Sequence, residues 1–571
     1  MNPTQRRHMA GMAAVAVLSL SLVYFYYIGL YCSDDTRYLI GAIKIAIGEP
    51  ISTASLAERR VLLLLPAAAG FAITGSLGFS VALYGIWLVA IGCATYLLAR
   101  RQMAVWASVA CAALALAQPV FFLFAGSLLP DVPAALFLAL ALGSFWRWSE
   151  ARLSGTHRQV LLHAAVTGVC LALGFMLKES SIVLLVVPLA FLAVWALMGR
   201  FRQSLEAGIA LMVGLLAMLL LESMVFRVTA GQWYSSIASL LNPHDFSLYV
   251  EEQGRTPLAR LHTLGGLLGW HTSFLFLAAA LATLQLAWQR YRGAISTESA
   301  WAWAGVVAFW FWPLLYFTFG SASLSEYRFP VMQQRYYAPC IVPAALLAGR
   351  LLASLELPGW LRGLSRPVAL AALAGLVCAP YLLRHQRGLV YSATAKEAFE
   401  VALQDAQRRF PGIPVVDSDT GWTTDLNRCR VLLASAGGGS QARLLDSIRS
   451  GEDLSGHFGY PNTARLKLPI IVVGHGDYFT AQPLSPWIRG LQRRIERENL
   501  TVERIGRYDV RPRRALKGLW WLPREQAVAL SLRTVSARES LQRPADAPEE
   551  EEYALLPIVD LYLVGEGTAE Q

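Results

Sequence analysis

Apolar runs close to twenty residues long recur through the first two thirds of this chain, and they constrain its fold more than any other feature. A run of that length matches the helix that crosses the hydrocarbon core of a bilayer. The chain has 571 residues, of which 55% are hydrophobic and only 15% charged. We therefore predict an α-helical polytopic membrane protein rather than a large soluble enzyme.

Arginine pairs between the runs set the expected topology. Short cytoplasmic loops carry an excess of Lys and Arg, so Arg6-Arg7 and Arg100-Arg101 should lie on the same side of the membrane. An even number of spans must then separate them, which places Val61–Leu77 on or shallowly in the outer leaflet. The eleven predicted spans are residues 9–30, 78–99, 104–124, 131–148, 159–177, 180–198, 205–226, 265–288, 300–319, 337–352 and 366–383.

With these spans the N-terminus is cytoplasmic and the C-terminal region is outside. The predicted inner loops are short and basic, whereas acids, bases and aromatics gather in the outer loops. The first run follows Arg6-Arg7-His8, as a signal peptide would, but it is too long and ends in the bulky Tyr24-Phe25-Tyr26-Tyr27. We therefore expect an uncleaved first span.

The character of the chain changes after Arg384, so we expect a membrane domain over residues 1–384 and an extracytoplasmic domain over 385–571. The second part is polar, rich in Arg and punctuated by Gly and Pro. Alternating helix and strand patterns predict a small α/β domain there. Expected strands are 413–416, 430–433 and 470–473, with a further candidate within 553–564, and expected helices are 395–409, 441–450 and 486–499.

Several classes of site find no support in the sequence. The net charge is +10, but the bases are scattered between apolar runs, which serves topology and does not indicate nucleic-acid binding. The seven cysteines form no CxxC pair, and the nine histidines form no HExxH motif. The sequence thus requires no cofactor and shows no metal-site motif, and a divalent metal requirement stays open.

The first outer loop, Tyr31 to Tyr38, holds the strongest candidate for chemistry. Asp34 and Asp35 are adjacent acids at a membrane border, where uncompensated charge is costly and usually functional. A carboxylate held beside an attacking hydroxyl can accept its proton, so we predict both as catalytic. The alternative is an ordinary solvated loop in which Asp35 caps the next helix.

Other charged and aromatic residues on the same side suit a phosphate leaving group, which needs cations rather than a general acid. Two adjacent acids cannot easily flank a glycosidic bond, so a glycosidase is disfavoured. The alternatives are a helix cap for Asp131, a local ion pair for Lys178-Glu179 and interfacial anchors for the tyrosines. The phosphate-binding candidates are Arg37, Arg59, Arg60, Lys178 and Arg335, and the cavity candidates are Tyr38, Asp131, Glu179, Tyr336 and Tyr337.

Four stretches of the sequence, by their order along the chain and their predicted place on the outer side of the membrane, make the chain similar to C-type membrane glycosyltransferases of the protein O-mannosyltransferase and lipid A aminoarabinose transferase kind. The resemblance covers roughly residues 1–383. That family usually has Asp-Glu where this chain has Asp34-Asp35. The matching stretches are Asp34-Asp35-Thr36-Arg37-Tyr38, Gly126-Ser127-Leu128-Leu129-Pro130-Asp131-Val132-Pro133, Gly174-Phe175-Met176-Leu177-Lys178-Glu179 and Arg335-Tyr336.

The resemblance implies a sugar donor on a polyprenyl phosphate, of undecaprenyl type, in the bacterial inner membrane. It implies transfer with inversion to an extracytoplasmic glycolipid, lipopolysaccharide, polysaccharide or protein. Asp34 would be the base, and Asp35 would support it or orient the acceptor. Arg37 and either Arg59 or Arg60 would hold the lipid phosphate, and Lys178 and Arg335 would line the cavity.

Two rival functions remain open at this point. A transporter or flippase of a lipid-linked sugar should show charges inside the spans or repeated halves with broken helices. Glu222 is the main charge within a span, and no repeat is evident. A transferase of phosphoethanolamine type would need metal ligands in the polar part, but Asp417, Asp419, His457 and His475 have no metal-site spacing.

Overall fold

The computed structural model of the chain comprises two compact units. One consists of Met1–Tyr27, Tyr38–Gly75 and Phe79–Tyr381, and the other of Ile28–Arg37, Ser76–Gly78 and Leu382–Gln571. The structure describes residues 2–26, 34–53, 56–122, 128–154, 156–238, 256–321, 330, 332–354, 401–402, 405–406, 408–410, 413, 415–417, 468–475, 486–509 and 558–565. For Asp34 and Asp35 the description covers the backbone and not the side chains.

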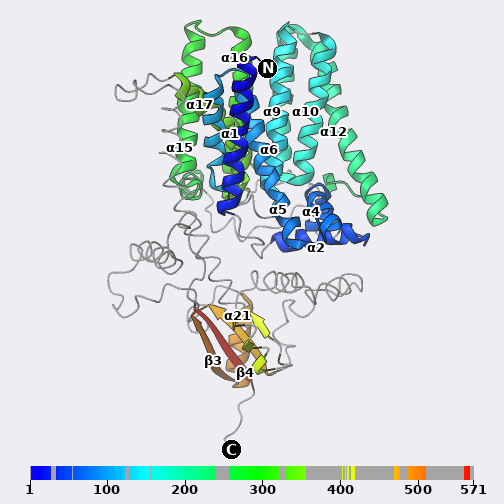
Figure 1. Cartoon of the computed structure of the whole chain (residues 1–571), viewed down its shortest axis with the longest axis vertical. Coiled ribbons are helices and arrows are strands. Elements are labelled where there is room, and N and C mark those ends of the chain that lie inside the picture. Colours follow the sequence, from blue (N-terminus) through cyan, green and yellow to red (C-terminus); the bar gives the residue numbers. More distant parts are fainter. Residues whose placement is uncertain are drawn as a thin grey trace, which may run out of the picture. The chain divides into compact units, whose positions relative to one another are not determined.

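Long helices dominate the first unit (Figure 1). Eight stretches of the described residues are long and apolar enough to cross a membrane, so the chain is a multi-pass membrane protein. The helices are α1 (Pro3–Tyr26), α5 (Leu77–Ala82), α6 (Ile86–Ala99), α7 (Val105–Leu116), α8 (Pro119–Phe122), α9 (Asp131–Ser154), α10 (His157–Leu177), α11 (Val186–Trp195), α12 (Phe201–Ala230), α15 (Pro257–Tyr291), α16 (Thr297–Phe319) and α17 (Ala338–Ser354).

These helices lie where the apolar runs predicted spans, with one informative difference. The predicted span 104–124 is divided into α7 and α8. The stretch Glu179–Ala230 holds two predicted spans, which separate where Met198 and Gly199 leave the helical conformation. The last predicted span, 366–383, lies outside the described residues, so the total of eleven stays a prediction.

Local sequence signals fix where several helices begin and end. At the start of α10, the Thr156 hydroxyl accepts a hydrogen bond from the Gln159 N–H (3.3 Å), and the Gln159 side chain accepts one from the Thr156 N–H (3.1 Å). This reciprocal cap satisfies two otherwise unpaired donors. The helix α12 ends at Ala230, and the next residue, Gly231, has a φ of 69°, in the left-handed region that favours glycine.

Helices α10 and α12 approach each other closely because two glycines face carbonyl groups of the partner helix. A Cβ atom on Gly168 would lie 2.0 Å from the Leu211 oxygen, and one on Gly214 would lie 2.1 Å from the Ala165 oxygen. Small residues allow such backbone contact between membrane helices, where packing rather than hydrophobic collapse drives association.

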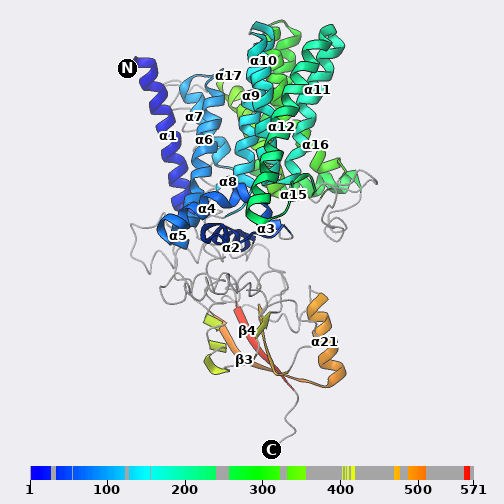
Figure 2. The same ribbon diagram turned by 90° about the vertical axis from the view of Figure 1, so that its right-hand side faces the viewer.

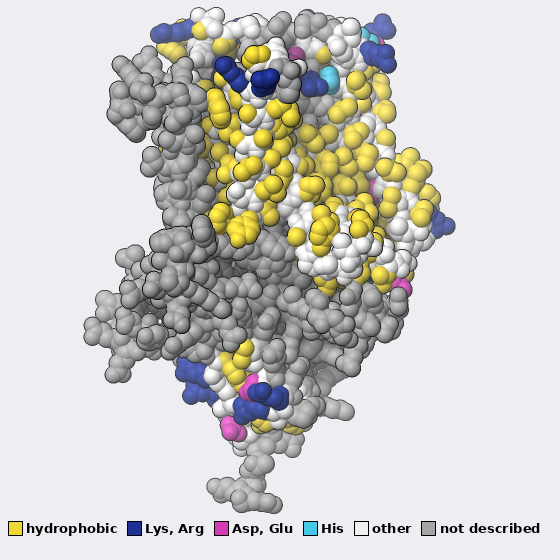
Figure 3. Space-filling model, in the orientation of Figure 1, with side chains coloured by type: hydrophobic (Ala, Val, Ile, Leu, Met, Phe, Trp, Pro, Cys, Tyr) yellow, Lys and Arg dark blue, Asp and Glu magenta, His cyan; other side chains and the backbone are white. Residues whose placement is uncertain are grey.

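The helix bundle has two chemically different ends. Helices α9 and α10 run in opposite directions, so Arg152 and Arg158 lie at one end, whereas Asp131 and Lys178 lie at the other. Arg101 pairs with Glu150 at the first of these ends, which we call the basic end. Figure 3 shows apolar side chains covering the outside of the bundle, with Lys and Arg gathered near its top.

Short helices lie at the opposite end, which we call the polar end (Figure 2). They are α2 (Asp34–Ile47), α3 (Leu56–Arg59) and α4 (Val61–Thr74). The 14 residues of α4 extend about 21 Å, less than the roughly 30 Å of a hydrocarbon core. Residues 34–37, predicted as loop, instead form the first turn of α2, where negative charge favours the helix dipole.

The second unit contains a four-stranded sheet of order β1-β2-β4-β3. The pair β1–β2 is parallel, whereas β4 is antiparallel to both β2 and β3. Leu491 of α21 packs with Ile470, Val472, Tyr562 and Val564 to form a core. The elements are β1 (Val415–Asp417), β2 (Ile470–His475), α21 (Pro486–Glu498), β3 (Thr501–Asp509) and β4 (Ile558–Gly565).

Two expected elements of this unit, 430–433 and 441–450, lie outside the described residues, and β3 was not predicted.

Candidate functional site

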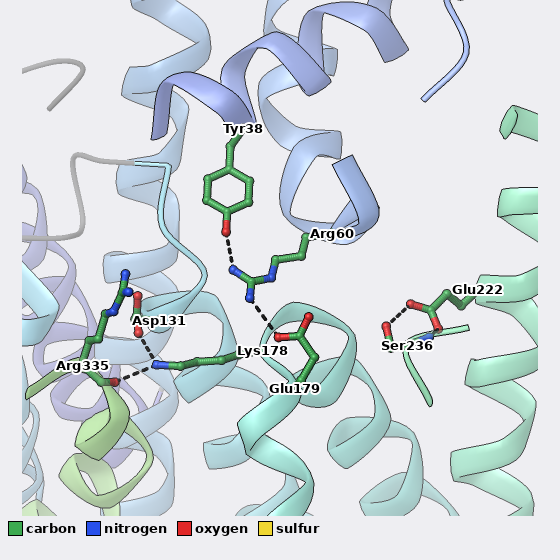
Figure 4. A network of polar contacts seen from close by, with 8 residues as sticks. All are labelled: Tyr38, Arg60, Asp131, Lys178, Glu179, Glu222, Ser236 and Arg335. Atoms are coloured by element: carbon green, nitrogen blue, oxygen red, sulfur yellow. Dashed lines mark hydrogen bonds and ion pairs between the residues drawn. The ribbon is translucent and has the colours of Figure 1, made fainter. Parts of the chain in front are cut away.

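The polar end brings charged side chains together from elements far apart in the sequence (Figure 4). Arg60, just before α4, lies between Tyr38 of α2 and Glu179, the first residue of η2 (Glu179–Leu185). Its Nη2 atom is 2.9 Å from Glu179 Oε2, and its Nη1 atom donates to the Tyr38 hydroxyl. Burial alone would lower the pKa of Arg60, but Tyr38 and Glu179 raise it, so this guanidinium stays charged.

A second cluster forms around Lys178, which follows the last residue of α10. Its Nζ atom donates to Asp131 Oδ1 and to the Arg335 carbonyl, 3.0 Å away, and lies 4.4 Å from the centre of the Tyr336 ring. Asp131 is only 1% exposed and Lys178 only 6%, so this is a buried ion pair. The extended backbone at Lys178 ends α10 and directs the chain into η2.

Burial lowers the pKa of Lys178 to about 8. Asp131 opposes this shift because a negative neighbour favours the charged amine, whereas Arg335 and Arg60 reinforce it. Lys178 therefore changes charge near neutral pH, which an ordinary lysine does not.

The two clusters are joined by a single peptide bond, because Lys178 and Glu179 are consecutive. Lys178 pairs with Asp131 and not with its sequence neighbour, which pairs with Arg60. Two polar atoms in this set are buried and make no hydrogen bond among the described residues, namely Nε of Arg60 and Oδ2 of Asp131. With Arg335 included, cations outnumber acids by one in this set, and the Nε–H of Arg60 is a donor that an anion could accept from.

Seven of the candidates from sequence meet in these clusters. They are Tyr38, Arg60, Asp131, Lys178, Glu179, Arg335 and Tyr336.

Arg59 and Tyr337 are directed elsewhere. The Nε atom of Arg59 donates to the Thr53 carbonyl, and its guanidinium lies 5.1 Å from the centre of the Tyr234 ring. Tyr337 is 1% exposed, and its hydroxyl lies 3.4 Å from that of Thr318. The polar atoms of both side chains are therefore directed to groups other than the Lys178 cluster.

The first turn of α2 holds the remaining candidates. Asp34 and Asp35 begin this helix, and Arg37 is exposed on it. One turn of helix separates Asp34 from Tyr38, so these two positions share a face of α2. The side chains of both aspartates lie outside the described part of the structure.

Two buried charged residues near the polar end hold segments of the chain in place, a role that the sequence did not reveal. Glu222 of α12 is 3% exposed and accepts hydrogen bonds from the Ser236 N–H, at 2.8 Å, and from the Ser236 hydroxyl. This fastens the segment after α12 to the helix, and the same segment carries Tyr234. Periodicity marks Glu222 as an intramembrane charge but cannot name its partner.

Arg260 of α15 is fully buried and holds main-chain groups together. Its Nε atom donates to the Thr318 carbonyl at 2.6 Å, and its Nη2 atom donates to the carbonyls of Phe317 at 3.1 Å and Pro330 at 2.7 Å. A cation at the last carbonyls of α16 is favoured by the helix dipole. It also anchors Pro330, five residues before Arg335.

A family model described as dolichyl-phosphate-mannose-protein mannosyltransferase matches residues 68–230, which include Asp131, Lys178 and Glu179. A comparison with curated protein sequences finds no match.

Solved structures share the fold at low sequence identity. ArnT from Cupriavidus metallidurans bound to undecaprenyl phosphate has a TM-score of 0.53 and 15% identity, over 83% of this chain and 93% of that one. Its apo form has a TM-score of 0.53 and 13% identity, over 82% and 93%. The oligosaccharyltransferase AglB from Archaeoglobus fulgidus, in complex with an inhibitory peptide and a dolichol-phosphate, has a TM-score of 0.51 and 11% identity, over 97% and 88%.

The fold and the charged polar end define a multi-pass membrane protein with the C-type glycosyltransferase architecture. The resemblance drawn from the sequence is confirmed, and its most specific support is the match of residues 68–230 to the mannosyltransferase family model.

Proposed function

We propose that this protein transfers a sugar from a polyprenyl phosphate to an acceptor outside the cytoplasm. The observation that carries the proposal is the pair of linked clusters, Arg60–Glu179 and Lys178–Asp131, at one end of an apolar helix bundle. The match to a mannosyltransferase family and the polyprenyl phosphates bound by two structural neighbours support the choice of donor.

The cations of the polar end would bind the phosphate of the donor. A departing phosphate gains negative charge as its bond to the sugar breaks, and fixed cations in a site shielded from water stabilise that charge strongly. Arg60 offers an unpaired Nε–H, and Lys178 offers an ammonium already held by Asp131 and the Arg335 carbonyl. Arg37, on α2, is a further candidate.

Asp34 would act as the general base. The acceptor hydroxyl oxygen attacks the anomeric carbon of the sugar, and the bond from that carbon to the phosphate oxygen breaks with its electron pair leaving on the phosphate. The hydroxyl proton moves to the Asp34 carboxylate, and the anomeric configuration inverts. Asp35 would orient the acceptor. One turn along α2, Tyr38 contacts Arg60, which links the base to the phosphate site.

We place the polar end on the extracytoplasmic side of a bacterial inner membrane, with the N-terminus in the cytoplasm. The basic end holds Arg101 and Arg152, and the excess of arginine in short loops favours that end inside. Residues 385–571 would then form an extracytoplasmic domain on the side of the acceptor.

The test is sugar transfer by the purified full-length protein, using a panel of polyprenyl-phosphate sugars and mass spectrometry of the products. We expect a new glycosidic bond with one donor and release of polyprenyl phosphate. The reaction above needs no metal, so EDTA should leave the rate unchanged. Movement of a lipid-linked sugar across vesicles without bond formation would instead support a flippase and overturn the proposal.

A further inference from the structure

At the basic end of the bundle, an arginine side chain stacks on tryptophan rings. Arg152, near the C-terminus of α9, has its guanidinium carbon 3.6 Å from the ring centre of Trp195 in α11 and 5.9 Å from that of Trp301 in α16. Trp148 contacts Trp195 edge-on, with the ring centres 5.5 Å apart, so the aromatic contacts continue into the bundle. Three helices thus fix one guanidinium in place.

The charge of Arg152 is not neutralised by the part of the chain that the structure describes. Its guanidinium makes no ion pair or hydrogen bond there. Among the described residues, the charged neighbour that acts on it is Arg200, which is also positive and therefore repels it. The indole N–H groups of Trp148 and Trp195 are buried and lack hydrogen-bond partners among the described residues. Arg152 is half-buried and Arg200 is exposed, and an anion bound between them would offset their mutual repulsion.

The surface beside this pair of arginines is apolar. Where the chain turns from α11 to α12, Leu197 is 88% exposed, Met198 59% and Phe201 67%. The turn is made possible by Gly199, whose φ is 81°. Exposed apolar side chains next to a fixed cation suit a ligand that has both an anionic group and acyl chains. A free phosphate ion would satisfy only the charge.

We propose that Arg152, stacked on Trp195 and Trp301, and the neighbouring Arg200 bind the phosphate of an anionic phospholipid whose acyl chains lie against Leu197, Met198 and Phe201. Basic pockets between membrane helices bind such headgroups. The site lies at the opposite end of the bundle from Lys178 and is distinct from the proposed donor site. It would hold the α11–α12 turn in place.

The test compares full-length protein in nanodiscs of phosphatidylcholine alone with nanodiscs that also contain phosphatidylglycerol. Thermal unfolding measures protection, and native mass spectrometry counts retained phosphatidylglycerol. We expect phosphatidylglycerol to raise the unfolding temperature of the wild type. In R152Q this rise should vanish, and the affinity for phosphatidylglycerol should fall about fivefold, the effect of losing one interfacial arginine.

The matched control is R158Q, which removes an exposed arginine at the same end of the bundle. It should keep the full protection. If R152Q proves unstable, R152K keeps the charge but loses the planar stacking and should lose part of the protection. The proposal is overturned if R152Q keeps the full rise, if R158Q loses as much, or if inorganic phosphate in phosphatidylcholine nanodiscs protects equally.

Discussion

Removing the charge of Lys178 should destabilise the protein far more than a surface substitution does. The change K178M keeps the volume of the side chain but leaves Asp131, 1% exposed, without its partner. An uncompensated buried charge costs about 3–5 kcal/mol. Asp131 has no other hydrogen bond to fall back on, since its Oδ2 atom is already unpaired among the described residues, so we expect the upper part of that range.

The double variant K178M/D131N separates this charge effect from loss of packing. It removes both charges, so the amide replaces a stranded carboxylate with a neutral group of the same shape. We expect the double variant to lose roughly half as much unfolding stability as K178M, because removing both charges costs less than leaving one buried charge unpaired. The assay is reversible unfolding in mixed micelles for the wild type, both single variants and the double variant, analysed as a double-mutant cycle.

Sugar transfer should be low in all three variants, so the differences among them should appear in unfolding stability and not in activity. A control is R202Q, which removes an exposed arginine from an i,i+4 pair with Glu206 and should change stability by less than about 0.5 kcal/mol. Strictly additive losses from K178M and D131N would refute the buried ion pair as the source of the effect.

Three further predictions follow from the same structure. Because burial sets the pKa of Lys178 at about 8, kcat/KM should fall as pH rises through about 8, and K178R should not show this fall. The free energy of unfolding should rise between this pH and the ordinary lysine pKa, because in that interval the unfolded state binds a proton that the folded state has lost. The change D34N should lower transfer about 10²–10⁴-fold with normal unfolding, the loss expected of a positioned base; a folded and fully active D34N protein would end the mechanism. The change G168A should cost about 3 kcal/mol in unfolding measurements, because the Leu211 carbonyl cannot move away, whereas G208A meets only an ordinary contact at 3.4 Å and should be tolerated.

The helical architecture could be predicted because it depends on composition over long stretches. Apolar runs and arginine pairs mark spans whatever their neighbours do, and α9, α10 and α16 lie where those signals placed them. The break in the run 104–124 was not predicted although the sequence marks it, because Pro119 follows the end of α7 at Leu116 and is the first residue of α8. The strand β3, with Arg504 and Arg507, was hidden by its polar composition.

The partners of charged residues could not be predicted from spacing. Lys178 is adjacent to Glu179 but bonds to Asp131, because the end of α10 and the start of α9 meet in space. Arg59 and Arg60 are adjacent and equivalent in the sequence, yet only Arg60 contacts Glu179. The sequence identifies which residues are unusual at a membrane border, and helix packing decides which of them meet.

The anchor at Arg260 has a consequence for engineering. It recognises carbonyl groups of Phe317, Thr318 and Pro330, and a carbonyl is the same whatever side chain the residue bears. Phe317, Thr318 and Pro330 can therefore change in side chain without losing these three contacts, provided that the backbone path is kept. Substitution of Arg260 itself would instead remove all three contacts at once, so this one side chain is the position that a design must keep.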